Sequence, residues 1–309
     1  MTVTHADVKA ARDDPKLANV LYHDFEATTY DGKWSITFDD RCTDFARDRF
    51  VSIAGRDGWP YGAALEIGAG TGFFALNLKR AGVIDRVSVT DISPGMVEVA
   101  VRNGARCGFE VEGKVADAET LPFGDESFDL VVGHAVLHHI PDVEQALREA
   151  LRVLRPGGRF VFAGEPTRHG DVVARRLSTW TWAVASRAVQ LPGVRRWGRT
   201  KQELTESSAA AALEWVVDLH TFEPGELSRL ALRAGAGDVR ARTEELTAAW
   251  FGWPMRTFEC TVQADRLSRY YYLAVYRTWQ TLMALDSRVL ARVVPAGLFY
   301  NVLVTGVRP

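Results

Sequence analysis

Apolar and polar positions along the chain predict a parallel sheet with helices between its strands. Seven short segments, some of them continuous apolar runs, have the length of strands, at residues 64–67, 86–91, 109–115, 128–132, 159–164, 238–243 and 299–307. Stretches with apolar residues at helical spacing lie between them, notably at 73–78, 142–154 and 224–234. We therefore expect an α/β fold with a twisted seven-stranded sheet and helices on both faces.

Three glycines at alternate positions, Gly68, Gly70 and Gly72, separate the first strand from the helix that follows. Glycine lets the backbone approach a ligand closely, and the free N–H groups of a first helical turn can bind a polar or anionic group. A dinucleotide fingerprint needs a glycine at position 73, which is Phe73 here. The spacing therefore argues against a nicotinamide-dependent oxidoreductase.

Two further groups of ionisable residues fall at expected carboxyl ends of strands, where open α/β sheets bind ligands. Asp91 ends the second strand, where a carboxylate can accept hydrogen bonds from both hydroxyls of a ribose. After the fourth strand come His134, His138 and His139. Since no cysteine or acid lies near these histidines at metal-ligand spacing, we expect no metal site.

The pattern from Glu66 to Gly72, together with residues 121–132 and 151–160, resembles class I S-adenosylmethionine-dependent methyltransferases. This resemblance is continuous from residue 63 to 165 and implies a Rossmann-like core with S-adenosyl-L-methionine as cofactor. It implies that Glu66 supports the loop and the methionyl amino group, and that His134 lies beside the methionyl part. The cofactor contacts that it implies are Tyr30, Glu66, Gly68, Ala69, Gly70, Gly72, Asp91, Ile92, Met96, Asp117, Ala118 and His134.

In the same family the position of His139 lies near the sulfonium end of the cofactor. Histidine titrates near neutral pH, so His139 is the first candidate for a base that removes a proton from the methyl acceptor. Glu165 and His23 are weaker candidates. His134 and His139 could instead be structural residues hydrogen-bonded in a loop, and O-, N- and C-methylation are not distinguished by the sequence.

Two long insertions divide the predicted domain. The expected parts are an N-terminal helical cap (1–60), a cofactor-binding core (61–165), a helical lid (166–222), the rest of the sheet (223–245 and 297–309) and an aromatic substrate cap (246–296). The lid segment has eight Lys or Arg against two acids between residues 165 and 201. Its part at 172–201, which contains tryptophans, fits either a lid over the site or a contact with a membrane or acidic partner. The aromatic residues of the second insertion favour a small apolar acceptor.

Composition excludes few classes of protein but agrees with this interpretation. The net charge of −2 argues against nucleic-acid binding, and three widely spaced cysteines fit no disulfide framework. A polar N-terminus without an apolar segment predicts a cytoplasmic protein. The alternative to a methyltransferase is a non-catalytic protein of the same fold that docks on a membrane or partner. The sequence leaves the oligomeric state open.

Overall fold

The chain forms two compact units in the computed structural model, which describes residues 5–205, 207 and 216–309. The first unit consists of Met1–Glu165, Leu213–Arg242 and Leu303–Pro309, and it contains the sheet. The second unit, Pro166–Ala212 and Thr243–Val302, is mainly helical. The division of the chain into five parts that the sequence suggests stays a prediction.

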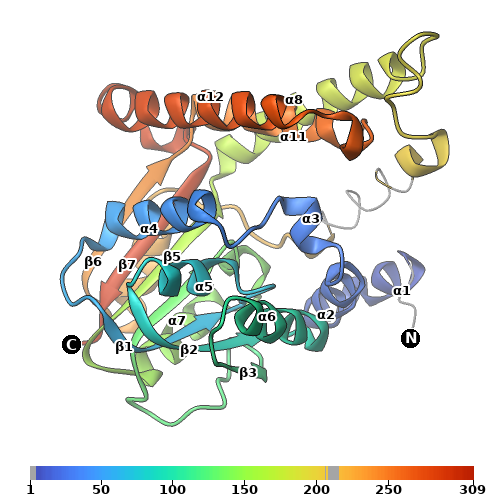
Figure 1. Ribbon diagram of the computed structural model, residues 1–309. Helices are drawn as coiled ribbons and strands as arrows, with labels where there is room; N and C mark the ends of the chain where they lie inside the picture. The colour runs from blue at the N-terminus through green and yellow to red at the C-terminus, as the bar shows by residue number, and fades with distance from the viewer. Residues whose placement is uncertain (1–4, 206, 208–215) are drawn as a thin grey trace. The chain divides into compact units, whose positions relative to one another are not determined.

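The first unit is built on a seven-stranded sheet with the order β3-β2-β1-β4-β5-β7-β6. Helices cover both faces of this sheet (Figure 1), so the predicted fold class is confirmed. Strands β3, β2, β1, β4 and β5 pair in parallel. The strands are β1 (Tyr61–Ile67), β2 (Ile84–Asp91), β3 (Val111–Val115), β4 (Phe128–His134), β5 (Leu154–Pro166), β6 (Gly237–Glu244) and β7 (Asn301–Val307).

Four helices of the first unit begin at side chains that cap them. Asp14, Asp39, Ser93 and Asp142 each accept a hydrogen bond from a backbone N–H of the first turn. The helices are α1 (His5–Ala10), η1 (Ala11–Asp13), α2 (Pro15–Glu26), α3 (Tyr30–Trp34), α4 (Asp40–Ala54), α5 (Phe73–Arg80), α6 (Pro94–Arg106), η2 (Leu137–His139), α7 (Val143–Val153) and α10 (Glu226–Ala234).

The main hydrophobic core explains why the central strands read as continuous apolar runs. Residues 63–67 of β1 are all buried, as expected for a strand covered on both faces. Phe50 of α4 and Phe74 of α5 are fully buried in the same cluster as Leu130 of β4. This packing fixes the carboxyl ends of β1 and β4, which carry the glycine loop and the histidines.

Strand β5 is longer than the predicted run of residues 159–164. It begins at Leu154 and includes the turn at 156–158, which pairs with the last residues of the chain. Gly157 donates its N–H to the carbonyl oxygen of Arg308 (2.9 Å), and Arg308 donates its N–H to Gly158 (2.9 Å). A turn-forming sequence therefore became part of a strand because β7 supplied the missing partners.

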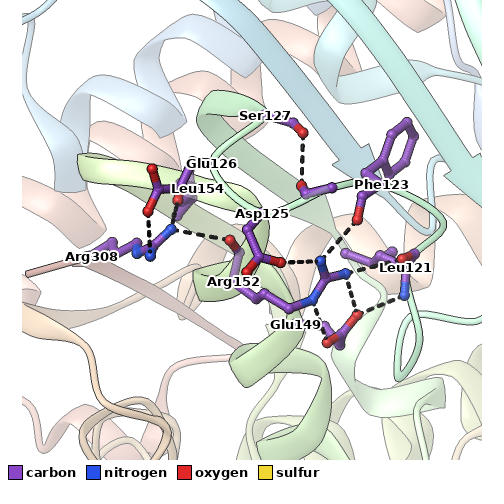
Figure 2. Close-up of polar contacts among 10 residues, drawn as sticks. Leu121, Phe123, Asp125, Glu126, Ser127, Glu149, Arg152, Leu154 and Arg308 are labelled. Carbon is purple, nitrogen blue, oxygen red and sulfur yellow. Dashed lines mark hydrogen bonds and ion pairs between the residues drawn. The ribbon is translucent and has the colours of Figure 1, made fainter.

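A polar network around Arg152 fixes the loop that precedes β4 (Figure 2). The guanidinium donates to the carbonyl oxygens of Phe123 (2.8 Å) and Leu121 (3.0 Å) and binds Glu149 through two nitrogens (2.9 and 2.8 Å). The side-chain hydrogen bonds to Glu149 and Asp125 raise the pKa of Arg152 above its ordinary value. One side chain thus joins α7 to residues 121–125.

We expect Arg152→Met to lower the free energy of unfolding by about 2–3 kcal/mol, because it leaves two carbonyl groups and Glu149 without their donor. Urea unfolding monitored by circular dichroism measures this loss. Arg148→Met is the matched control: Arg148 lies on the same helix, has a half-exposed side chain and pairs with Glu144 one turn away. Its loss should stay below about 0.5 kcal/mol. Equal losses in the two variants would contradict a structural role for the network.

The second unit consists of helices packed around aromatic and aliphatic side chains. Helix α11 packs against both α8 and α12, and Trp182, Val189, Phe258 and Val262 meet in one cluster. Its helices are α8 (Arg168–Ala188), α11 (Thr247–Glu259), η3 (Ala264–Arg266), α12 (Arg269–Arg288), η4 (Leu290–Arg292) and η5 (Ala296–Leu298). Across the described residues of both units, every helix is too short or too polar to cross a membrane.

Candidate functional site

The glycine loop after β1 adopts a backbone conformation that other residues rarely take. Gly68, Gly70 and Gly72 all have positive φ, at 58°, 53° and 87°. A Cβ atom on Gly68 would lie 2.0 Å from Cγ2 of Val136, so this position excludes any side chain. At Gly70 the nearest atom would be Cε1 of Tyr30 at 4.0 Å, which leaves the loop open on that side.

Asp91, at the end of β2, is a buried carboxylate that holds this loop. Its Oδ2 accepts the N–H of Gly70 (2.8 Å), and its Oδ1 accepts the N–H of Ser93 (2.9 Å). Burial raises the pKa of Asp91 to about 6, against the effect of these two N–H groups. Each carboxylate oxygen has a second lone pair, so Asp91 can still accept two hydroxyl donors.

Glu66, in strand β1, is deeply buried and supports the glycine loop. Its Oε2 accepts the N–H of Ala75 in the first turn of α5 (3.0 Å), and its carbonyl oxygen accepts the hydroxyl of Thr90 (3.2 Å). Burial raises the pKa of Glu66 to about 8. The carboxyl group is therefore mostly protonated at neutral pH, and it joins β1 to α5 without placing a second full charge beside Asp91.

The N-terminal segment packs onto the same edge of the sheet, where α2 lies beside α6 (Figure 1). Asp24 of α2 accepts the N–H of Gly95 (2.9 Å) and the hydroxyl of Ser93 at the start of α6. Met96 is fully buried, with Ala27 and Tyr30 packed around it. These contacts bring Tyr30 to the glycine loop.

Glu165, at the end of β5, organises the loop that follows β4. Its Oε1 accepts the N–H groups of Val136 and Leu137 (both 3.0 Å), and its Oε2 accepts the N–H of His138 (3.1 Å) and its ring Nδ1–H (2.8 Å). The side chain is inaccessible to solvent. All four contacts use the carboxylate as an acceptor, so Glu165 holds the histidine loop in place.

Three histidines from two distant segments meet beside this loop. The rings of His138 and His139 lie 4.0 Å apart, and the ring of His23 from α2 lies 5.3 Å from that of His139. The Nδ1–H of His139 donates to the carbonyl oxygen of Val217 (3.0 Å), which leaves the lone pair on Nε2. Burial lowers the pKa of His139 to about 4, and the neighbouring His138 acts in the same direction. Burial also holds the pKa of His23 well below its ordinary value.

Asp218 completes this cluster and changes the argument about metals. Its Oδ1 lies 3.7 Å from Nε2 of His138 and 3.6 Å from Nδ1 of His139. In the described parts of the chain, these three residues form the one group whose side chains could hold a metal ion, with ligand atoms within 4.8 Å of one another. Asp218 lies far from these histidines in the sequence, so an argument from metal-ligand spacing could not include it, and the expected absence of a metal site stays a prediction.

His134, at the end of β4, contacts a buried cation. Its Nε2 lies 2.6 Å from a guanidinium nitrogen of Arg49, and its ring packs on Phe73 and Phe74. Burial, together with Arg49, holds the pKa of His134 well below its ordinary value. Because arginine only donates, the neutral His134 accepts through Nε2.

Comparisons with known proteins agree with this geometry. The family described as a methyltransferase domain matches residues 65–162. A ubiquinone/menaquinone biosynthesis C-methyltransferase from Nitrobacter hamburgensis is 39% identical over 102 residues, which are 32% of this chain and 40% of that protein. The malonyl-[acyl-carrier protein] O-methyltransferase of Geobacter sulfurreducens is 32% identical over 206 residues, which are 62% of this chain and 73% of that protein. The chain belongs to the class I S-adenosylmethionine-dependent methyltransferases.

The solved structure of phosphoethanolamine N-methyltransferase 2 from Haemonchus contortus, in complex with S-adenosyl-L-methionine, has the same fold. It aligns with a TM-score of 0.53 at 15% identity, over 86% of this chain and 52% of that one. The family's cofactor is S-adenosyl-L-methionine. The site's polar atoms fit such a ligand, because Oγ1 of Thr71 and Oδ1 of Asp31 are buried beside the loop without a hydrogen-bond partner in the described chain.

The structure brings together most of the residues expected at the cofactor, although their individual roles stay predictions. Gly68, Ala69, Gly70 and Gly72 form the loop, with Tyr30, Glu66 and Asp91 around it. Ile92 and Ala118 are half-buried at the ends of β2 and β3. Asp117 is engaged by Lys16 of α2 (2.6 Å) and by the N–H of Glu119 (2.9 Å).

Sequence reasoning did not select five residues that the folded chain places at the site: Asp24, Asp31, Arg49, Thr71 and Asp218. Asp24 and Asp31 lie in residues 22–34, a stretch that is unusually rich in aromatic and ionisable side chains. Their presence in such a stretch is the sequence signal by which they could have been selected. Arg49 and Asp218 lie in ordinary helical or loop sequence and gave none.

Proposed function

We propose that the chain transfers the methyl group of S-adenosyl-L-methionine to a small, apolar acceptor that loses a proton in the reaction. The observation that carries this proposal is the arrangement of one edge of the sheet. The glycine loop and Asp91 follow β1 and β2, and the loop after the neighbouring strand β4 carries His139, whose Nε2 keeps a lone pair. The relative named for quinone C-methylation supports an acceptor that loses a proton in the reaction.

The bound cofactor supplies an electrophilic methyl group on a positively charged sulfur. The chain's own task is to align the acceptor with that bond and to exclude water. Asp91 and the glycine loop hold the nucleoside end, and the segment around Tyr30 covers the loop. His139 takes the acceptor's proton on Nε2, while the bond from its Nδ1–H to Val217 keeps the ring in the required tautomer.

The expected apolar character of the acceptor rests on the sequence, whose second insertion is rich in aromatic residues. Aromatic side chains bind flat apolar molecules with large contact areas.

Cofactor binding is tested by calorimetric titration with S-adenosylhomocysteine. We expect micromolar affinity, no binding of NAD, and a loss of about 10–100-fold in Asp91→Ala, because one charge-assisted contact to the ribose is worth about 1.5–3 kcal/mol. Asp85→Ala is the matched control, since Asp85 is exposed at the opposite end of the same strand. Well-folded wild-type protein that fails to bind S-adenosylhomocysteine would reject the proposal.

Methyl transfer itself is tested with isotopically labelled S-adenosyl-L-methionine and a panel of hydroxynaphthoquinones, phenols and acyl malonates. Transfer to at least one apolar acceptor is the expected result. Tight cofactor binding without transfer to any member of the panel would favour the non-catalytic alternative.

A further inference from the structure

Helix α8 and the loop after it carry exposed apolar side chains in unusual number. Trp180 is 73% exposed and Val184 is 63% exposed, and the exposed set continues with Val172, Leu191, Val194 and Trp197. Scattered exposed apolar residues are normal in soluble proteins. Six within 26 consecutive residues, two of them tryptophans, are a surface feature that needs a reason.

All charged residues of the same stretch are basic. Residues 172–197 contain no Asp or Glu, and four of their arginines are exposed, namely Arg176, Arg187, Arg195 and Arg196. The fifth, Arg175, pairs with Asp171 through Nε (2.6 Å) and lies off the exposed face. The net charge of the whole chain is −2, so this basic surface is local.

Helical spacing places these residues on one side of α8. Positions 172, 176, 180, 184 and 187 follow one another at steps of four or three, which align them along a single face. Ala174 and Ala185 are buried, and Trp182 packs in the cluster with Phe258. One side of α8 therefore packs within its own unit, and the exposed side combines tryptophan, valine and arginine.

We propose that this surface, residues 172–197, docks on an anionic phospholipid membrane. Tryptophan and valine side chains enter the headgroup region, and arginines reach the lipid phosphates while their stems lie along apolar surface. Charge complementarity selects a negatively charged surface, and the exposed valines and leucine select lipid over a nucleic acid, which offers them no apolar contact. The proposal concerns attachment and does not depend on the methyl transfer.

Vesicle flotation of the full chain tests the proposal, with phosphatidylcholine alone and with added phosphatidylglycerol. We expect binding only to the anionic vesicles, weakened by salt. Each basic residue near the surface is worth about a fivefold change in partitioning, so Arg195→Gln with Arg196→Gln should weaken binding about 25-fold. The matched control is Arg102→Gln with Arg106→Gln, two exposed arginines of α6.

The apolar contribution is tested in the same assay with Trp180→Ser against Leu232→Ser, a 58% exposed residue of α10. We expect several-fold weaker binding only for the first, together with loss of the blue shift of tryptophan fluorescence on vesicle addition. No flotation of the wild type, or equal effects of test and control variants, would overturn the proposal. So would equally tight binding to a DNA duplex, which would identify a general polyanion site. S-adenosylhomocysteine titration on the same samples reports the cofactor site separately.

Discussion

Replacing His139 by glutamine is expected to lower kcat for methyl transfer about 10²–10⁴-fold, the usual contribution of a positioned base. Binding of S-adenosylhomocysteine should change little, because glutamine keeps an N–H donor for the carbonyl oxygen of Val217 and similar size. His169→Gln is the control: His169 is exposed in the second unit, outside the cluster. An unchanged kcat in His139→Gln would exclude a base at this position.

The pH dependence distinguishes a base from a residue that only packs. Because burial lowers the pKa of His139 to about 4, the neutral form that accepts a proton persists well below pH 6.5. At saturating S-adenosyl-L-methionine, the wild-type kcat should therefore stay flat as pH falls from 8 to about 5, and then decline toward pH 4. His139→Gln should lose this decline along with the rate.

The same shift affects stability. The folded state favours neutral His139, so the contribution of this group to the free energy of unfolding is fully present above its ordinary pKa of 6.5. It is lost as pH falls from 6.5 toward 4, because the unfolded chain takes up the proton first. Urea unfolding at a series of pH values separates this loss from the catalytic one.

The sheet could be predicted from the sequence because strands buried on both faces are continuous apolar runs. β1 and β4 read this way, and their burial in one core is the reason. The extension of β5 could not be predicted, since residues 156–158 have turn chemistry and only the distant Arg308 gives them strand partners. The local pattern predicted strand β5, and pairing with a distant residue decided where this strand begins.

The candidate site also has one part that the sequence predicts locally and another part that it does not. The glycine loop and Asp91 are adjacent to predicted strands, so spacing alone located them. Asp218 reaches the histidines from a segment that is distant in the sequence and has no periodic pattern, and Arg49 is one of several arginines on an amphipathic helix. Contacts of this kind depend on how segments pack, which a single sequence does not encode locally.

Replacing Glu165 by glutamine is expected to lower the free energy of unfolding by about 2–4 kcal/mol. An amide nitrogen in place of Oε2 faces two donors, the backbone N–H and the ring Nδ1–H of His138, and leaves them unsatisfied beside a side chain that solvent does not reach. Glu98→Gln, at an exposed position of α6, should have almost no effect. Thermal and urea unfolding measure both.

Acid pH supplies the second test of Glu165. Burial alone would raise the pKa of this carboxyl, but its hydrogen bonds to His138 and the loop N–H groups hold it below the ordinary value. Its stabilising effect is therefore complete above about pH 4.5 and is lost as pH falls below that value, so the gap between wild type and Glu165→Gln should narrow there. A variant that is as stable as wild type but inactive would instead make Glu165 a catalytic base. Loss of stability with an altered histidine loop, and partial rescue by Glu165→Asp, is the result expected of a carboxylate that positions His138 and His139.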